Sequence, residues 1–235
     1  HDPGRGSRVG AGVSELRVAF HTLGCRVNQA DTIALEDELR SRDAVLVGPR
    51  EVADVYVLNT CTVTHAADAD ARKIARRMKR QNPDGRVIVT GCYAQIDPAA
   101  LTAVPEVDLV LGNDKKHLLA DALLAMQAGA APDPADPTVS RGPTPTSHRR
   151  RGRDWTPRVR PPRSQITALP ETHTRPFLKV QDGCDYTCAF CIIPKARGVS
   201  RSLSVDEVAR QANRYAELGA VEIVLTGIHL GHWGR

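Results

Sequence analysis

Short apolar runs alternate with amphipathic segments along residues 14–128 of this chain. The apolar runs are rich in Val, Leu and Ile, and they predict buried strands. These runs are Leu16–Phe20, Ala44–Val47, Val55–Leu58, Arg86–Thr90 and Val107–Leu111. Between them, apolar residues recur at helical spacing, so each strand is predicted to lead into a helix or a turn.

The first predicted helix buries Ile33, Leu35 and Leu39 and turns charged residues outward. A second helix is predicted over Ala66–Gln81, ended by the turn Pro83-Asp-Gly85. Further helices are predicted over Pro98–Ala103 and over Lys115–Gln127, with Gly129 as the C-cap of the last. Strands that alternate with helices predict an α/β domain with a mostly parallel sheet, Rossmann-like or flavodoxin-like, over residues 14–128.

Residues 129–172 break this alternation, because they are rich in proline and arginine. Such a composition favours a flexible or polyproline-like linker over a packed core. Regular structure is predicted again over residues 173–235: a strand at Phe177–Val180, a helix at Ser204–Leu218 and a strand at Glu222–Thr226. Ser204 is a suitable N-cap, since acidic residues follow it in the first turn.

The charge of the chain is concentrated in one place. The formal net charge is +5, but eight Arg and one Asp between Arg141 and Arg163 give that segment a local +7. The rest of the chain is therefore slightly acidic. No apolar run approaches the roughly 18 residues that cross a bilayer. The first residues are polar and form no secretory signal, so we expect a cytosolic protein without a membrane anchor.

Three of the six cysteines each follow a predicted strand of the first domain. They are Cys25, Cys61 and Cys92. The carboxyl ends of parallel strands meet at one edge of a sheet, which is where ligands bind. A lone cysteine is often only a small buried apolar residue. Three in the same topological position predict a shared site, and soft thiolates suit zinc or an iron–sulfur cluster.

The other three cysteines lie within eight residues, at Cys184, Cys188 and Cys191. A compact loop can direct three such thiols at one centre. A structural zinc site normally has four ligands, so a zinc site here would need a histidine. The nearest histidines are His173 and His229. The spacing, with an aromatic residue before the last cysteine, resembles instead the loop of the radical S-adenosylmethionine superfamily.

Several segments extend this resemblance to the methylthiotransferases. They are Thr22-Leu-Gly-Cys-Arg-Val-Asn-Gln29, Asn59-Thr-Cys61, Thr90-Gly-Cys-Tyr-Ala-Gln95 and Gln181-Asp-Gly-Cys184, with similar segments at 193–198 and 225–229. The resemblance covers about residues 14–128 and 174–235. It implies that the first cysteine trio binds an auxiliary [4Fe–4S] cluster. The second trio would then bind a radical [4Fe–4S] cluster together with S-adenosyl-L-methionine, at the start of a partial β/α barrel.

The segment around Cys25 is most similar to that of the enzymes acting on N6-threonylcarbamoyladenosine beside the anticodon of tRNA. The isopentenyladenosine enzymes typically carry a Tyr-Gly-Cys-Gln-Met-Asn type of segment, and the ribosomal-protein enzymes a Leu-Gly-Cys-Pro-Lys-Asn type. Arg26 and Val27 fit neither. The resemblance therefore implies a transferase that inserts a methylthio group at C2 of the adenine. Its partners would be tRNA, bound through the anticodon stem-loop, and an electron donor protein.

The resemblance also suggests residues that contact the cofactor. Phe190 is expected to line its adenine, unless it is a buried aromatic of the barrel rim. Thr226 and Gly227 are expected to contact its amino-acid part, the alternative being an ordinary turn after a strand. A helix with six cations between Arg72 and Arg80, and the Arg-rich linker, could each contact RNA or simply face solvent. His21 and His65 lie near Cys25 and Cys61, without an assigned role.

The length leaves two other functions open. The 62 residues from Thr174 onward are too few for a closed barrel of about 250 residues, so we expect a fragment or truncated product. One alternative is thus a non-catalytic iron–sulfur module. The other is a zinc-binding nucleic-acid adaptor, which would be colourless, whereas two [4Fe–4S] clusters absorb visible light.

Overall fold

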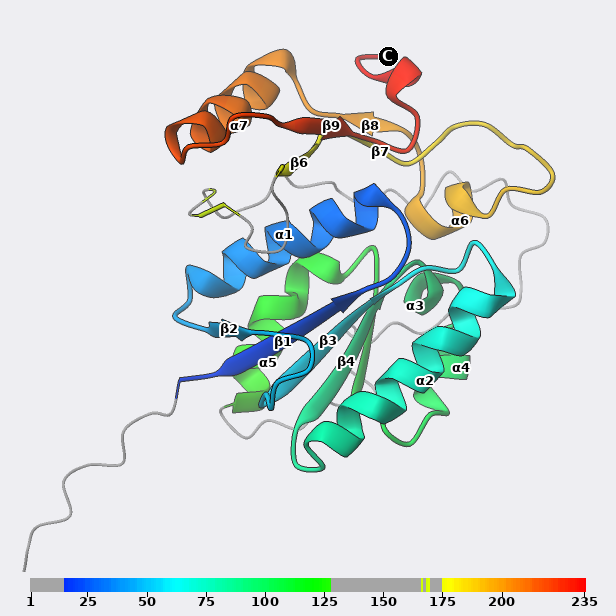
Figure 1. The fold of residues 1–235 in the computed structure, drawn as a ribbon. Helices are drawn as coiled ribbons and strands as arrows, with labels where there is room; N and C mark the ends of the chain where they lie inside the picture. The colour runs from blue at the N-terminus through cyan, green and yellow to red at the C-terminus, as the bar shows by residue number, and fades with distance from the viewer. Residues whose placement is uncertain (1–14, 128–165, 167, 170–174) are drawn as a thin grey trace, which may run out of the picture.

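A parallel sheet of five strands is the largest feature of the computed structural model, which describes residues 15–127, 166, 168, 169 and 175–235 (Figure 1). The strand order is β2-β1-β3-β4-β5, and all four strand pairs are parallel. This is the flavodoxin-like doubly wound order, so the predicted α/β class is confirmed. The strands are β1 (Arg17–Thr22), β2 (Val45–Val47), β3 (Val55–Thr60), β4 (Arg86–Gly91) and β5 (Leu109–Gly112).

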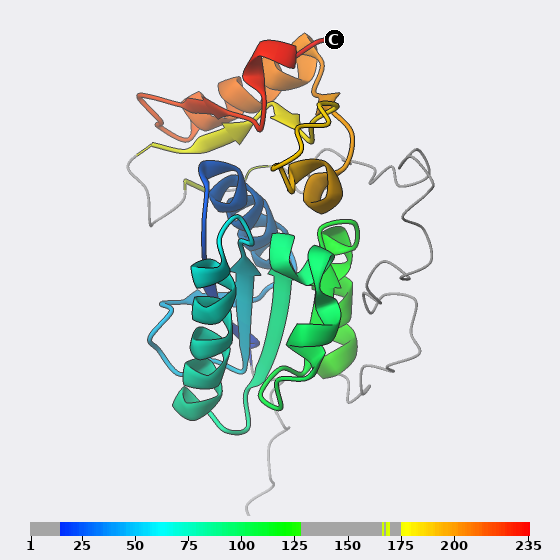
Figure 2. The ribbon, with the colours of Figure 1, turned by 90° about the vertical axis from the view of Figure 1, so that its right-hand side faces the viewer.

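Helices cover both faces of this sheet (Figure 2). One face carries α1 (Arg26–Arg40) and α5 (Leu119–Gln127), the latter entered through a short turn of 3₁₀ helix, η1 (Lys116–Leu118). The other face carries α2 (His65–Gln81), α3 (Cys92–Ile96) and α4 (Pro98–Thr102). The predicted helices are thus present, and α3 is an addition that the apolar pattern did not predict.

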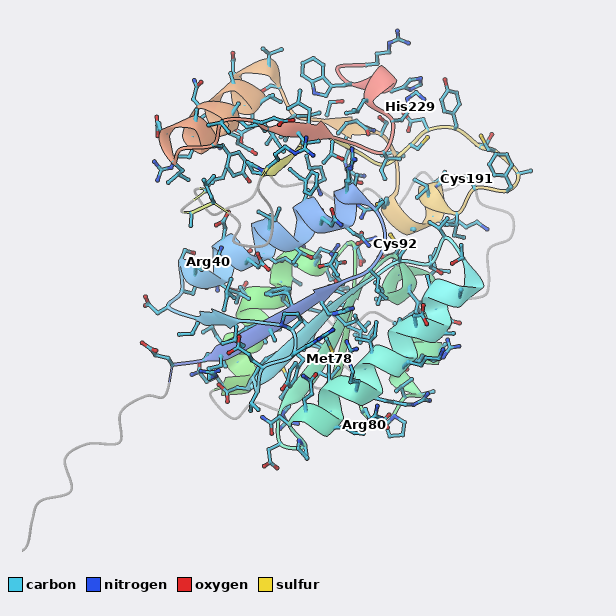
Figure 3. The ribbon with its side chains drawn as sticks, viewed as in Figure 1. Arg40, Met78, Arg80, Cys92, Cys191 and His229 are labelled. Carbon is cyan, nitrogen blue, oxygen red and sulfur yellow. The ribbon has the colours of Figure 1, made fainter. Side chains whose placement is uncertain are left out.

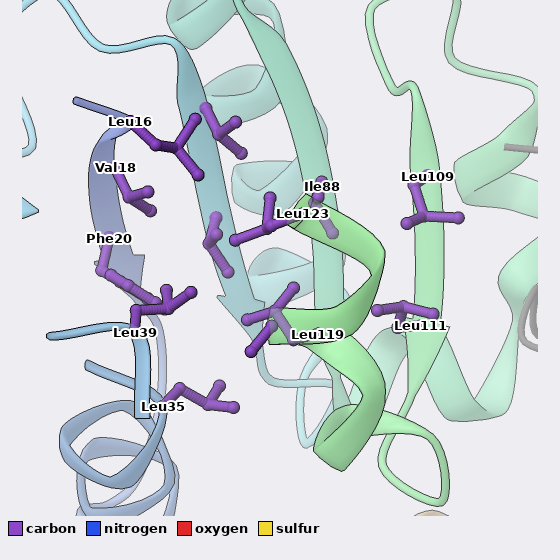
Figure 4. Close-up of a cluster of buried hydrophobic side chains, with 13 residues drawn as sticks. Leu16, Val18, Phe20, Leu35, Leu39, Ile88, Leu109, Leu111, Leu119 and Leu123 are labelled. Atoms are coloured by element: carbon purple, nitrogen blue, oxygen red, sulfur yellow. The ribbon is translucent and has the colours of Figure 1, made fainter. Parts of the chain in front are cut away.

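Aliphatic side chains fill the space between the sheet and its helices. In the cluster under α1 and α5, Leu39 and Leu123 pack against strand residues such as Val18 and Ile88 (Figure 4). All four are buried. Truncating such a leucine to alanine typically costs about 2–5 kcal/mol. The strands that lead to the cysteines are therefore held in place by a well-packed apolar core.

The C-terminal residues form a smaller β/α layer. Strands β6 (Phe177–Lys179) and β9 (Val224–Thr226) pair in parallel and are connected through α7 (Val205–Glu217). The side chain of Ser204 caps α7, as predicted, by accepting a hydrogen bond from the backbone of Glu207 at 3.2 Å. The short elements β7 (Gln181–Asp182), α6 (Ile193–Arg197), β8 (Arg201–Ser202) and η2 (Leu230–His232) complete this layer and were not predicted.

The smaller layer sits on the carboxyl-terminal side of the sheet and on the outer side of α1 (Figures 1 and 2). Strands β6 and β9 contact α1, and α6 contacts α3. Among the described residues, no helix is both long and apolar enough to span a bilayer. The predicted C-cap Gly129 and the Arg-rich run 141–163 lie outside the described residues.

Candidate functional site: two facing cysteine trios

The first cysteine trio lies along one edge of the sheet, as the sequence predicts. Cys25 is the N-cap of α1, Cys61 follows β3 directly, and Cys92 is the first residue of α3. The three strands before them, β1, β3 and β4, are neighbours in the sheet. Because α1 and α2 cover opposite faces, the strand order reverses between β1 and β3. The trio therefore occupies the topological switch point, where doubly wound sheets bind ligands.

Two glycines allow the loops of this trio to come together. Gly24 has φ +92°, and a Cβ placed on it would lie 2.8 Å from the Sγ of Cys61. Gly91 has φ +99°, and its Cβ would lie 2.4 Å from the carbonyl oxygen of Thr60. A side chain at either position would clash in a conformation that L residues rarely adopt. Each of the two glycines thus packs closely against the end of the neighbouring strand β3.

The three thiols are close enough to influence one another. Burial raises the pKa of the Cys61 thiol, and the thiolates of Cys92 and Cys25 raise it further. Cys61 and Cys92 are buried, whereas Cys25 is exposed. The side-chain amide of Asn113, just after β5, lies 3.5 Å from the Sγ of Cys92 as a donor. The trio is thus one electrostatic unit with one side open to solvent.

The donor set of this trio, three soft thiolates, is chemically suited to an iron–sulfur cluster. Within the ranges that the structure describes, no three His, Cys, Asp or Glu side chains lie close enough together to hold one metal ion. A lone zinc ion needs its ligands in a compact tetrahedron. Cysteine thiolates are the usual ligands of an iron–sulfur cluster. Cys25, Cys61 and Cys92 would be the residues that hold such a group.

The second trio lies in the loop between β7 and α6. This loop leaves β7 at Gly183, where φ is +73° and a Cβ would lie 2.0 Å from the carbonyl oxygen of Val199. The backbone of Cys184 then donates to Gly198 at 3.0 Å, and that of Cys191 to Cys188 at 3.1 Å. These bonds fold the loop into a compact arc. Cys188 is exposed, and the other two thiols are partly buried.

An aromatic group lies beside the second trio. The hydroxyl of Tyr186 is 2.9 Å from Nε2 of His232, and the rings of His229 and His232 meet edge to face with centroids 4.3 Å apart. His229 also meets the ring of Tyr186. Its ring is therefore part of this aromatic group. His173, the other candidate zinc ligand, lies outside the described residues.

The three predicted cofactor contacts, Phe190, Thr226 and Gly227, differ in their surroundings. Phe190 stands on the cysteine loop with 93% of its surface exposed, so the alternative of a buried rim aromatic is wrong. Thr226 is buried at the end of β9, opposite Lys179 of β6. Gly227 packs on Gln181, where a Cβ would lie 3.0 Å from that side chain. Contact with a cofactor stays a prediction for all three.

One cysteine of each trio lies at the contact between α3 and α6. Cys92 begins α3, and Cys191 lies two residues before α6. Figure 3 shows both residues bordering the space between the sheet and the smaller layer. The side chain of Asn113 fixes this contact, because it donates to the carbonyl oxygen of Ala196 at 2.8 Å. Two segments that are 83 residues apart in the sequence at this contact therefore lie against each other.

A buried group of charges, which the sequence analysis missed, lies at the same junction. It contains two carboxylates and three cations: Asp31, Lys116, Lys179, Asp182 and Arg197. Asp31 of α1 is its centre, with Lys116 at 3.0 Å, Arg197 at 3.1 Å and a short bond to Lys179. Burial alone would raise the pKa of Asp31, but the three cations hold it well below its usual value.

A local signal for this group was present in the sequence. Asp31 shares the helical spacing of Leu35 and Leu39, and Asn28 precedes it by three residues. Polar residues in the register of an apolar helix face are costly to bury unless they are paired. Their partners Lys179 and Arg197 lie more than 140 residues away in the sequence, which no local pattern reveals.

The six cations of α2 are less free than the sequence suggested. Arg72 donates to the hydroxyl of Tyr93 at 2.5 Å, and Lys79 pairs with Asp108 at 3.2 Å. Weaker pairs join Lys73 to Asp70 and Arg76 to Glu106. Arg77 and Arg80 are exposed. A surface for RNA on this helix stays a prediction.

The comparisons with known proteins agree with this geometry. A radical S-adenosylmethionine superfamily model matches residues 178–229, and the model of an uncharacterized protein family, UPF0004, matches residues 17–112. A cysteine trio on a flavodoxin-like sheet, joined to a radical S-adenosylmethionine segment, defines the class of protein. The chain belongs to the radical S-adenosylmethionine methylthiotransferase family.

Individual relatives include three curated proteins. The threonylcarbamoyladenosine tRNA methylthiotransferases MtaB of Bacillus subtilis and Aquifex aeolicus are each 39% identical over 93% of this chain, and the chain covers 45% and 49% of their lengths. The tRNA-2-methylthio-N(6)-dimethylallyladenosine synthase of Opitutus terrae is 31% identical over 93% of this chain and 49% of its own length. The chain thus spans about half the length of the curated relatives it matches.

Proposed function

We propose that this chain takes part in the insertion of a methylthio group at C2 of N6-threonylcarbamoyladenosine, beside the anticodon of tRNA. The observation that carries the proposal is the packing of α3, which begins at Cys92 of the first trio, on α6, which follows Cys191 of the second. Insertion of sulfur requires a sulfur source close to the place where a radical is generated. Two thiolate sites on facing elements supply that proximity, which lowers the barrier for transfer between them.

The roles of the cysteines follow from their position. Cys25, Cys61 and Cys92 would hold the auxiliary cluster, and the loop 184–191 would hold the radical cluster with S-adenosylmethionine. When bound, these groups supply the electron, the 5′-deoxyadenosyl radical and the methylthio group. The protein supplies position and charge, as is usual for cofactor chemistry, and it needs no side-chain general base. Phe190, Thr226 and Gly227 are the proposed contacts of S-adenosylmethionine.

The choice of substrate rests on two supports. The segment Thr22–Gln29 resembles that of the threonylcarbamoyladenosine enzymes, and two relatives at 39% identity are named for that nucleoside. The relative named for dimethylallyladenosine is less similar, at 31%. Action on tRNA in the cytoplasm, with an electron donor protein as partner, belongs to the same proposal.

Anaerobic reconstitution tests the cluster assignment. Two [4Fe–4S] clusters predict about eight irons per chain and broad visible absorption. A colourless protein that retains zinc would favour the nucleic-acid adaptor instead. With dithionite and S-adenosylmethionine, the loaded chain should release 5′-deoxyadenosine. Loaded clusters without that product would indicate a non-catalytic iron–sulfur module.

A matched variant then identifies the radical site. Cys188→Ala removes one ligand of the second trio and touches nothing in the first. It should abolish 5′-deoxyadenosine formation and leave about four irons per chain. Persistence of the product in this variant would show that the radical site has been assigned to the wrong cysteines. Methylthiolation itself is measured on tRNA that carries threonylcarbamoyladenosine, by mass spectrometry of the digested nucleosides.

A further inference from the structure

One guanidinium, that of Arg197, contacts the neighbourhoods of both cysteine trios. It donates to both carboxylate oxygens of Asp182, at 3.0 and 3.2 Å, and Asp182 lies two residues before Cys184. It also donates to Asp31 at 3.1 Å and makes a short hydrogen bond to the side chain of Asn28, three residues after Cys25. Arg197 itself ends α6, six residues after Cys191.

The environment of Arg197 is almost free of solvent. The side chain is 2% exposed, so its charge is little screened by water. Its Nε–H has no partner among the residues that the structure describes. A buried donor without a partner is costly and calls for an explanation, such as a ligand that is still to bind. A lysine could not make these contacts, because only the guanidinium forms a planar fork with several donors.

The charge of Arg197 acts on the first trio. Burial alone would lower the pKa of Arg197, but Asp182 and Asp31 raise it well above its usual value, and the thiols of Cys92 and Cys25 raise it further. The contacts place Arg197 beside this trio, because it bonds the side chain of Asn28, three residues after Cys25, and Asn113 joins the neighbouring Ala196 to the Sγ of Cys92. The buried group of two carboxylates and three cations carries a net +1, and this excess lies beside the first trio.

We propose that Arg197 is a positioning residue that locks the radical loop against the first cysteine trio and supplies the positive charge under which that trio holds its cluster. The second half of this proposal rests on the proposed function, because it requires a cluster on Cys25, Cys61 and Cys92. A nearby positive charge stabilises the reduced, more negative state of a cluster. Charge and hydrogen bonds to sulfur are among the factors that set cluster potentials.

The locking half is tested on the chain without clusters, by hydrogen–deuterium exchange of α1 and of the loop 183–192. Arg197→Gln should increase exchange there about a hundredfold, the factor that corresponds to roughly 3 kcal/mol lost when a buried ion pair is broken. Arg197→Lys should increase it less. Arg210→Gln, which removes an exposed arginine paired with Glu207 on α7, is the matched control and should change nothing at this junction.

The proposed effect of the charge of Arg197 is tested by the midpoint potential of the cluster on the first trio, which is measured in a redox titration monitored by electron paramagnetic resonance. The Cys188→Ala background leaves only that cluster to be measured. Adding Arg197→Gln should lower the midpoint potential, so that the cluster is harder to reduce. Adding Arg197→Lys keeps the charge and should leave the potential closer to that of the background. A merely structural role would shift both variants alike or neither.

The outcomes separate this inference from the proposed function. If the Cys188→Ala background loads no cluster, the proposed function fails. If the cluster loads and Arg197→Gln leaves its potential unchanged, only the charge half is overturned. Should Arg197→Gln fail to fold, as circular dichroism would show, Arg197→Lys still decides. If hydrogen–deuterium exchange is unchanged in Arg197→Lys, the locking role is refuted. If the midpoint potential of Arg197→Lys lies far below that of the Cys188→Ala background, the charge effect is refuted.

Discussion

The side chain of Asn113 joins the carbonyl oxygen of Ala196 to the end of β5, with a donor–acceptor distance of 2.8 Å. The same amide nitrogen lies 3.5 Å from the Sγ of Cys92. One side chain thus connects the first trio to the helix that follows the second. The predictions below test the contacts that hold this junction together.

Asn113→Ala should destabilise the chain by about 1–3 kcal/mol, because it leaves the carbonyl of Ala196 without its donor in a partly buried place. Urea unfolding followed by circular dichroism measures the loss. Thr102→Ala is the control, since the hydroxyl of Thr102 bonds only the carbonyl of Ala99 within its own helix on the exposed surface. Equal stability of the two variants would contradict the bridging role of Asn113.

Gly91→Ala should lower the free energy of unfolding much more than Gly219→Ala does. Both glycines have positive φ, +99° and +94°, so both substitutions introduce backbone strain of about 1–3 kcal/mol. Only at Gly91 would the new Cβ also collide with Thr60, whereas nothing lies within 4 Å at Gly219. The difference between the two unfolding free energies isolates the collision. If the two variants lose the same stability, then β4 is not in close contact with β3 at Gly91.

The contribution of Asp31 to stability should depend on pH with a definite sign. Its pKa is held well below the usual value in the folded chain, so it stabilises the fold above the unfolded carboxyl pKa of about 4. That stabilisation is lost as the pH falls toward the folded pKa. The difference in unfolding free energy between the parent chain and Asp31→Asn should therefore be largest at pH 6–7, on the order of 3 kcal/mol. It should shrink below about pH 4, and a difference that grew in acid would contradict this assignment.

Cys61→Ala should give the reverse of the result expected for Cys188→Ala. The variant removes a buried ligand of the first trio and leaves the loop 184–191 intact. Reconstituted anaerobically, it should bind about four irons and still release 5′-deoxyadenosine, while no methylthio product forms. Iron analysis and nucleoside mass spectrometry provide the two measurements. Methylthiolation by this variant would show that the first trio is not the source of sulfur.

The apolar pattern was enough to predict the sheet, because its strands β3, β4 and β5 are almost entirely buried and are rich in Val, Leu and Ile. The same pattern predicted the position of Cys25, Cys61 and Cys92, since each follows one of these strands. It did not reveal α3 or α6. Each is only five residues long, and α3 begins after Gly91, which provides no side-chain cap. Such short helices form through tertiary contact and not through local propensity.

The group around Arg197 was beyond local reasoning for a different reason. Asp31 and Arg197 are 166 residues apart in the sequence, so the register of Asp31 on the apolar face of α1 signals a buried charge but does not identify its partner. Asp31 meets its two distant cations because β6, which carries Lys179, packs on α1, and α6, which carries Arg197, packs on α3. Long-range electrostatics of this kind depends on the docking of whole elements. A pattern read along the chain contains no information about it.

Helix α1 is enclosed on two sides, by the sheet below and by β6 and β9 above (Figure 1). Nine of its fifteen residues are buried, and they include both apolar and polar side chains. An ordinary amphipathic helix leaves one face on which sequence can drift. Because α1 is packed on two sides, few of its positions can change freely. Saturation mutagenesis should find that most substitutions between Val27 and Leu39 destabilise the fold. Designers who wish to exchange the smaller layer between relatives would have to carry α1 with it.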